Sequence, residues 1–260
     1  GKYIFYSYQP HLITISSYSV IYSNQNIQKS SDFIFVRLNA ESAGNLLYSL
    51  YKVGGIDNSD GQYSLFNTDF SQYLRGDIDF RFYNVVDEDN SIVYRIFAGV
   101  GYPYSNSTAL PFEKKYFAGG ANSIRAWQVR NLGPGSYKEL SPGYYPNQTA
   151  DIKLEANLEY RFKMFWLLEG ALFLDAGNIW SITRDDDREG ALFEWDKFYK
   201  DIAIGTGFGA RFDFSFFIFR LDLGVKALDP AADEGNKWIP GSRKLTRDDI
   251  TLNLGIGYPF

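Results

Sequence analysis

The residue types that most often carry catalysis or hold a metal are nearly missing from this sequence. Its 260 residues include no cysteine and one histidine, His11. This excludes a thiol nucleophile, a disulfide framework and a zinc site that needs cysteines or two histidines. The run from Asp185 to Asp187 has the oxygen ligands that calcium prefers, but a charge run in a loop is more often simply solvated. We therefore expect no catalytic residue, no cofactor and no metal in this chain.

Charge and hydropathy exclude two further classes of protein. The chain has 26 Lys and Arg against 31 Asp and Glu, a net charge of −5, so electrostatics gives no reason to expect nucleic acid as a partner. No window approaches the roughly 18 consecutive apolar residues of a membrane-spanning helix. Aromatic residues make up 18% of the chain and glycines number 24, which fits an all-β protein, either soluble or a membrane barrel.

Alternation of apolar and polar residues predicts strands with one apolar face. Between 249 and 260 every even position is apolar, while the odd positions are polar, glycine or proline. A period of two residues is that of a strand. The same alternation runs through 66–82, 92–102, 152–162, 202–214 and 217–227, less cleanly through 32–43 and 167–180, and ambiguously through 1–23. We expect nine or ten strands, and the glycines from Gly205 to Gly209 then form a stripe on one strand face rather than a nucleotide loop.

The connections between these strands alternate in length. They are short near 84–90, 163–166 and 214–216, and long near 44–62, 104–150, 182–199 and 228–247. Short turns at one end and long loops at the other are typical of outer-membrane barrels. The strands of a soluble sandwich usually have about 5–6 residues, which is shorter than the alternating segments of this sequence. The predicted fold class is therefore all-β, a transmembrane antiparallel β-barrel with a long inserted loop. Because an open edge cannot face lipid, the strands must close or belong to a larger barrel.

The centre of the longest loop predicts a buried ion pair. Its apolar residues need an interior to pack against, and the barrel lumen is the nearest one. An arginine carried there, Arg125, requires a carboxylate partner, because an unpaired buried charge is costly. Strand parity places Glu159 on the lumen face, and Asp175 as well if Leu172 and Leu174 face lipid. Whether such a pair has a function or only fixes a plug in the barrel stays open at this point.

Four motifs in sequence order resemble the POTRA-bearing outer-membrane assembly and translocation superfamily typified by BamA and TamA. Residues of the loop tip are Gly119, Gly120, Ser123, Ile124, Arg125, Ala126 and Trp127. The two following strands carry Glu159 in one, and Phe173, Asp175, Gly177 and Trp180 in the other. Gly255, Gly257, Tyr258 and Phe260 resemble the aromatic-ended terminal signal. In that superfamily the acidic residues of the two strands bind the tip arginine. Ala126 departs from the usual glycine, and Ile-Arg-Ala-Trp followed by Leu-Gly-Pro-Gly is most similar to the TamA-like TamL branch of Bacteroidetes.

The resemblance implies a bacterial outer-membrane protein of which residues 1–260 are the C-terminal part, in a barrel of about sixteen strands. POTRA domains are then expected upstream of Gly1. The implied function is to insert or export outer-membrane proteins through a seam between the first and last strands. Gly255, Gly257 and Pro259 would weaken pairing of a last strand over 249–260. Implied partners are outer-membrane lipids, client outer-membrane proteins, and accessory lipoproteins or an inner-membrane protein.

Three other functions remain open from the sequence. A two-partner-secretion transporter would share the barrel and export one dedicated substrate. A barrel could also serve only as the membrane anchor of an enzyme fused upstream. An inert diffusion porin is the third.

Overall fold

A computed structural model describes residues 2–26, 31–55, 62–138 and 148–260. Parts of two predicted loops, 56–61 and 139–147, lie outside the described residues. The strands are β1 (Ile15–Ser23), β2 (Phe33–Ala43), β3 (Ser64–Leu65), β4 (Thr68–Asp69), β5 (Tyr73–Val85), β6 (Asn90–Pro103), β7 (Ile152–Phe165), β8 (Leu168–Trp180), β9 (Ala203–Asp213), β10 (Ile218–Leu228) and β11 (Ile250–Ile256). The short helices are α1 (Lys2–Ser7), α2 (Asn45–Val53), α3 (Ile239–Ser242), and the 3-10 turns η1 (Phe112–Lys114), η2 (Phe198–Asp201) and η3 (Arg247–Asp249).

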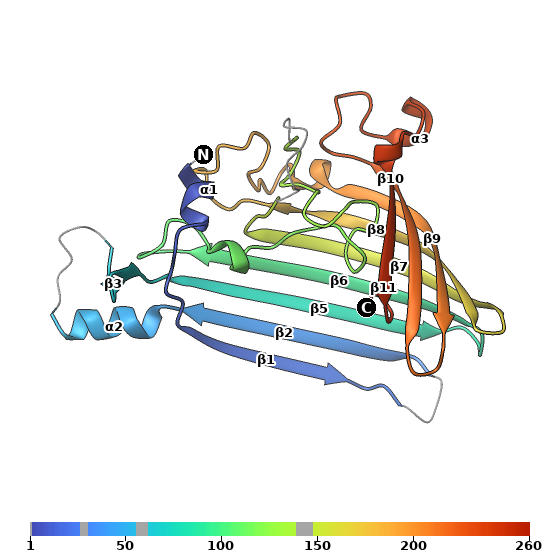
Figure 1. The fold of residues 1–260 in the computed structure, drawn as a ribbon, viewed down its shortest axis with the longest axis horizontal. Helices are drawn as coiled ribbons and strands as arrows, with labels where there is room; N and C mark the ends of the chain where they lie inside the picture. The colour runs from blue at the N-terminus through green and yellow to red at the C-terminus, as the bar shows by residue number, and fades with distance from the viewer. Residues whose placement is uncertain (1, 27–30, 56–61, 139–147) are drawn as a thin grey trace.

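Nine strands form one continuous antiparallel sheet in the order β1-β2-β5-β6-β7-β8-β9-β10-β11. Each strand pairs with the one before it in the sheet, and the sheet curls so that β9 to β11 turn over the others (Figure 1). The hairpin β3-β4 stands apart in the loop between β2 and β5. The predicted all-β antiparallel fold is confirmed, and the nine strands agree with the predicted number. None of the helices described is long and apolar enough to cross a membrane.

The two faces of the sheet differ as the alternation predicts. On β6, Tyr94 and Ile96 are exposed on the outer face, whereas Arg95 and Phe97 are buried on the other. On β8, Leu172 and Leu174 are exposed and Asp175 is fully buried. The outer face is thus an apolar surface suited to lipid, and the opposite face, which we call the lumen face, carries the charged side chains.

The two ends of the sheet differ in the length of their loops. Short turns join β5 to β6, β7 to β8 and β9 to β10 at one end (Figure 1). The long connections after β2, β6, β8 and β10 all leave from the other end. The longest of them is 104–151, and its described residues, 104–138 and 148–151, fold back over the lumen face of the sheet (Figure 1). We refer to it as the inserted loop.

Three local predictions from the alternation are wrong. Within 1–23, only 15–23 is a strand, because Lys2–Ser7 forms α1. The segment 66–82 is not one strand: Phe66 lies at the turn of the β3-β4 hairpin with φ of 53°, and β5 begins at Tyr73. Ala227 is buried rather than on the outer face, because a register shift between Lys226 and Leu228 turns it inward.

The end of the chain departs from the predicted strand over 249–260. The strand β11 ends at Ile256, and Gly257 adopts a φ of 79°, which a side chain would resist. The Gly257 N–H still donates to Ile218 O on β10 (2.8 Å), so the chain leaves the sheet after this residue. Phe260 then lies buried at 7% exposure instead of on the lipid face with the even-numbered residues of β11. The alternation of apolar and polar residues continues past Gly257, but the backbone no longer has the strand conformation there.

We predict that the outer face tolerates no charge. Ile96→Arg, at an exposed position in the middle of β6, should destabilise the membrane-folded protein by about 2–4 kcal/mol, because the arginine must enter hydrocarbon. Val86→Arg is the matched control, since Val86 is exposed in the turn after β5. Denaturant midpoints in lipid vesicles measure both, and equal losses for the two variants would contradict the assignment of the outer face to lipid.

Candidate functional site

The inserted loop is packed as a core element, not as a surface tether. Trp127 is 2% exposed, and Ile124 and Ala126 are fully buried. One apolar cluster joins loop residues to wall residues on β6, β8 and the start of β9: Phe97, Tyr116, Ala118, Ile124, Ala126, Trp127, Leu132, Ala150, Ile179 and Ala203. The loop is also bridged to itself, where Tyr116 pairs with Ala150 and Ala118 with Leu132.

Two glycines allow the loop tip, residues 119–127, to turn back on itself. Gly119 and Gly120 have φ of 92° and 90°, in the left-handed region that favours glycine. A Cβ at Gly119 would collide with the carbonyl oxygen of Gln128. Hydrogen bonds close the turn, from Gly120 N to Trp127 O (2.8 Å) and from Gly119 N to Ser123 Oγ (3.2 Å). The turn delivers Arg125 toward the sheet.

Arg125 is fully buried and held by two strands. Its Nε and Nη2 donate to the two carboxylate oxygens of Asp175 at 2.9 Å each, and its main-chain N–H donates to Asp175 Oδ2 at 3.0 Å. Its Nη1 donates to Glu159. The guanidinium carbon lies 3.6 Å from the centroid of the Phe173 ring, so the cation also rests on an aromatic face. A bidentate pair of this kind fixes geometry as well as charge.

Three more arginines extend the cluster around Glu159 and a third carboxylate, Asp222. Arg161 Nε lies 2.7 Å and Arg211 Nη2 lies 3.1 Å from Glu159. Asp222 on β10 lies 3.1 Å from Arg211 and 3.3 Å from Arg220. Arg211, Arg220 and Asp222 are each at most 1% exposed. The cluster thus links β7, β8, β9 and β10 to the loop tip, and burial weakens the screening of its charges.

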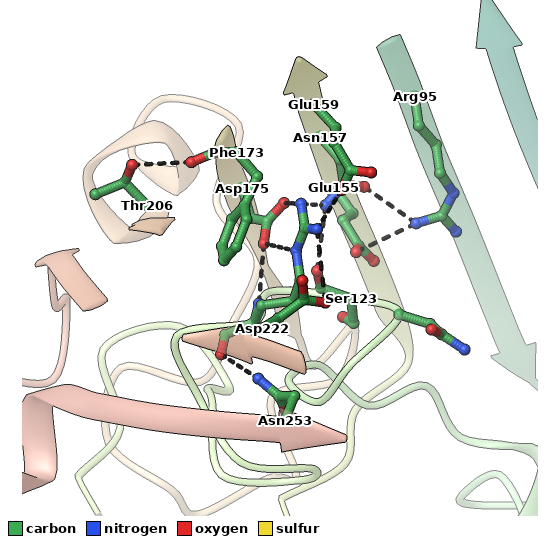
Figure 2. A network of polar contacts seen from close by, with 12 residues as sticks. Arg95, Ser123, Glu155, Asn157, Glu159, Phe173, Asp175, Thr206, Asp222 and Asn253 are labelled. Carbon is green, nitrogen blue, oxygen red and sulfur yellow. Dashed lines mark hydrogen bonds and ion pairs between the residues drawn. The ribbon is translucent and has the colours of Figure 1, made fainter. Parts of the chain in front are cut away.

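The cluster continues across the sheet toward β5. Arg95 on β6 donates to Asp79 on β5 (3.1 and 3.2 Å) and to Asn157 on β7 (3.1 Å). Asn157 in turn donates to Asp175 at 2.9 Å. Figure 2 shows Glu155, Asn157 and Glu159 along one strand, with Arg95 on the strand beside it. The tip is therefore anchored to a polar network that crosses six strands.

A second buried ion pair anchors the base of the inserted loop. Lys115 Nζ lies 3.4 Å from Asp151, and both side chains are almost inaccessible. Burial lowers the pKa of Lys115, although the carboxylate of Asp151 opposes that shift. Among the described residues no group of three or more His, Cys, Asp or Glu side chains is arranged to hold a metal ion.

We call the ion pairs of Arg125 with Asp175 and Glu159 the clasp. The other residues predicted from the sequence lie outside these ion pairs. Gly177 approaches β7 so closely that a Cβ would collide with Leu154 O, and Trp180 is fully buried at the end of β8. Tyr258 donates to Glu169 (2.8 Å), and its ring lies 4.2 Å from the Arg161 guanidinium. Arg161 also donates to Phe260 O (3.3 Å). The terminal residues thus contact the arginine cluster through Arg161, which the sequence did not suggest.

Ala126 needs none of the freedom of the glycine it replaces. It does not adopt a positive φ, so its methyl group causes no backbone strain. Several residues that contact the tip or its carboxylates were missed from the sequence, among them Asn157, Arg161, Arg211, Arg220, Asp222, Thr251 and Asn253. Their lumen-facing parity was visible in the alternation, but parity gives only the face of a residue and not its contacts.

A curled antiparallel sheet with an apolar outer face, long loops at one end and a buried arginine clasp defines an outer-membrane barrel with a loop locked into its lumen. The Omp85 superfamily domain matches residues 8–260, and the chain belongs to this superfamily. Membership indicates a bacterial outer-membrane β-barrel. A structure of BamA from Haemophilus ducreyi lacking POTRA domains 1–3 aligns with 94% of this chain at 12% identity and a TM-score of 0.47. This chain spans about half (54%) of that chain. A search of curated proteins finds no match.

We predict that Arg125→Ala releases the inserted loop. The change leaves the buried carboxylate of Asp175 without its ion pair and removes one of the three arginines around Glu159, at a cost of about 3–5 kcal/mol. Limited proteolysis of the folded protein should then cut within the loop, and the denaturant midpoint should fall. Arg184→Ala, which removes an exposed arginine from another loop, is the control and should change neither. Full protease resistance of Arg125→Ala would contradict the clasp as the anchor.

Proposed function

We propose that this chain is the barrel portion of an outer-membrane factor that inserts or translocates other outer-membrane proteins. The observation that carries the proposal is the Omp85 superfamily match over residues 8–260. In this proposal the clasp fixes the inserted loop inside the lumen by the buried ion pairs of Arg125 with Glu159 and Asp175.

Strand addition supplies the physical mechanism. A client strand cannot enter lipid with unpaired backbone groups, so it needs an edge to pair with. Within the described residues, β11 pairs only with β10, and Leu252, Leu254 and Ile256 point outward from it. In the proposed mechanism this strand lies at the seam where clients enter, and the tip, its carboxylates and the terminal residues brace the wall next to it.

Finer assignments rest on the motifs of the sequence. The tip Ile124-Arg125-Ala126-Trp127 supports a TamL-like protein of Bacteroidetes, with POTRA domains upstream of Gly1 and a complete barrel of about sixteen strands. Clients, outer-membrane lipids, and accessory lipoproteins or an inner-membrane protein are the proposed partners. No reacting group is assigned, so the proposed role is not enzymatic.

We predict that the clasp is needed for client assembly. In the full-length protein, Arg125→Ala should lower the steady-state level of client barrels severalfold, because the wall beside the seam loses its brace, and Asp175→Asn should act in the same direction. The pair Arg125→Glu with Asp175→Arg should restore part of the loss. Quantitative proteomics of outer membranes measures client levels, and a heat-modifiable gel shift verifies that each variant is folded.

Lys138→Ala is the matched control. It removes an exposed ion pair between the inserted loop and Asp233 (3.2 Å), so client levels should stay at the wild-type value. Unchanged client levels in a folded Arg125→Ala variant would refute the proposal. Loss of one secreted substrate with all barrels intact would also refute it, and would instead identify a two-partner-secretion transporter.

A further inference from the structure

The edge strand β11 is bonded to the inserted loop as well as to the sheet. Its ladder to β10 runs from the pair Val225 and Ile250 to the pair Phe219 and Ile256. Two lumen-facing side chains add bonds outside that ladder. Thr251 Oγ1 donates to Ala126 O (3.0 Å), and Asn253 Nδ2 donates to Arg125 O (2.8 Å). Figure 2 shows Asn253 reaching the network from the strand on the far side.

The wall beneath the tip has room for this segment because two glycines face it. A Cβ on Gly205 of β9 would lie 2.5 Å from Ala126 Cβ, and a Cβ on Gly224 of β10 would collide with the carbonyl group of Arg125. Real Cβ atoms do not approach so closely, so any larger residue at either position would push the tip away from the wall. The depth of the tip is therefore set by β9 and β10.

Residue 125 consequently connects two strands that are not neighbours in the sheet. Its N–H donates to Asp175 on β8, and its carbonyl accepts from Asn253 on β11. Both groups belong to one rigidly held residue, since the side chain of Arg125 is bound to the same Asp175. A displacement of the tip would therefore also displace the edge strand β11 or break its bonds to the tip.

We propose that the loop tip positions the edge strand: Gly205 and Gly224 set the depth of the Arg125-Ala126 segment, and Thr251 and Asn253 hold β11 against it. This inference rests on the proposed function, in which β11 is the strand that borders the client entry seam. Thr251, Asn253, Gly205 and Gly224 are then positioning residues that act on the seam through the tip.

The position of β11 can be measured directly, because these 260 residues contain no cysteine. Cysteines at Leu252 on β11 and Ile96 on β6, whose side chains are exposed on the outer face of the sheet, opposite to the tip, carry spin labels in the full-length protein after any cysteine elsewhere is replaced. Pulsed electron resonance in lipid vesicles then gives their distance distribution. Asn253→Ala and Thr251→Val each remove one donor, and each should raise the population of displaced β11 by roughly two- to tenfold.

Asn39→Ala is the matched control for Asn253→Ala. Asn39 is a lumen-side asparagine on β2 that donates to Asp77 (2.7 Å) and not to the tip, so its loss should leave the distribution unchanged. A wild-type distribution in the folded double variant Asn253→Ala and Thr251→Val would overturn the inference.

A size exchange tests whether the wall acts through the tip. Gly205→Ala should displace the tip and broaden the β11 distribution, and adding Ala126→Gly should restore it by removing the methyl group that Gly205→Ala would meet. Gly76→Ala on β5 is the control, because a Cβ there would make only an ordinary contact with Asn39 O (3.6 Å). A purely structural defect at Gly205 would not be relieved by removing one methyl group on the loop. Failure of the rescue would therefore overturn the role of Gly205.

The same variants separate this inference from the proposed function. A broadened β11 distribution with unchanged client levels would support the positioning role and refute client assembly as its purpose. An unmoved β11 label in the double variant, together with client loss in Arg125→Ala, would refute the positioning role and leave client assembly intact.

Discussion

The rest of the site depends on one constraint, the cost of burying the charge of Arg125 without water. A guanidinium removed from solvent must be met by carboxylates with correct geometry, or the loop that carries it cannot stay in the lumen. Asp175 accepts two hydrogen bonds from the guanidinium of Arg125 and a third from its main-chain N–H. Glu159, on the neighbouring strand, accepts another from the guanidinium. Those carboxylates are themselves buried and need the cation in return. The inserted loop and the wall are therefore folded as one unit, although the loop begins and ends far from the clasp.

The apolar and ionic parts of the tip have different consequences. Trp127 and Ile124 are the two large apolar side chains of the tip and both are buried, so they hold the loop inside without specifying its exact position. An apolar plug of equal volume would serve as well for stability, and buried ion pairs are often weaker contributors than the hydrophobic groups that could replace them. The ion pairs require one register. A tip shifted by a single residue would leave Asp175 without its cation and Glu159 with only Arg161 and Arg211.

Much of this arrangement could be predicted from sequence because two simple rules act together. A period of two residues assigns each side chain to a face, and the energetic penalty on a lone buried charge selects partners among the residues on one face. Arg125, Glu159 and Asp175 follow from both rules. The rules fail where the backbone departs from a regular strand. The turn at Gly257 sends Phe260 inward, and the shift near Ala227 reverses one residue, yet neither disturbs the alternation of residue types. Asn253 was also not predicted, because its contact with the carbonyl oxygen of Arg125 depends on how deep the tip lies in the lumen.

That depth explains why glycine on the wall and alanine on the tip belong together. Gly205 leaves the space that the methyl group of Ala126 fills, so the tip can carry this side chain against the wall. With the tip at this depth, the backbone of the single residue Arg125 connects β8 to β11. Its N–H donates to Asp175 and its carbonyl oxygen accepts from Asn253. Among the described residues β11 is paired along one edge only, the edge toward β10. In the proposed mechanism the bonds of Thr251 and Asn253 to the tip hold β11 in place from the lumen side, without using the backbone groups of its other edge.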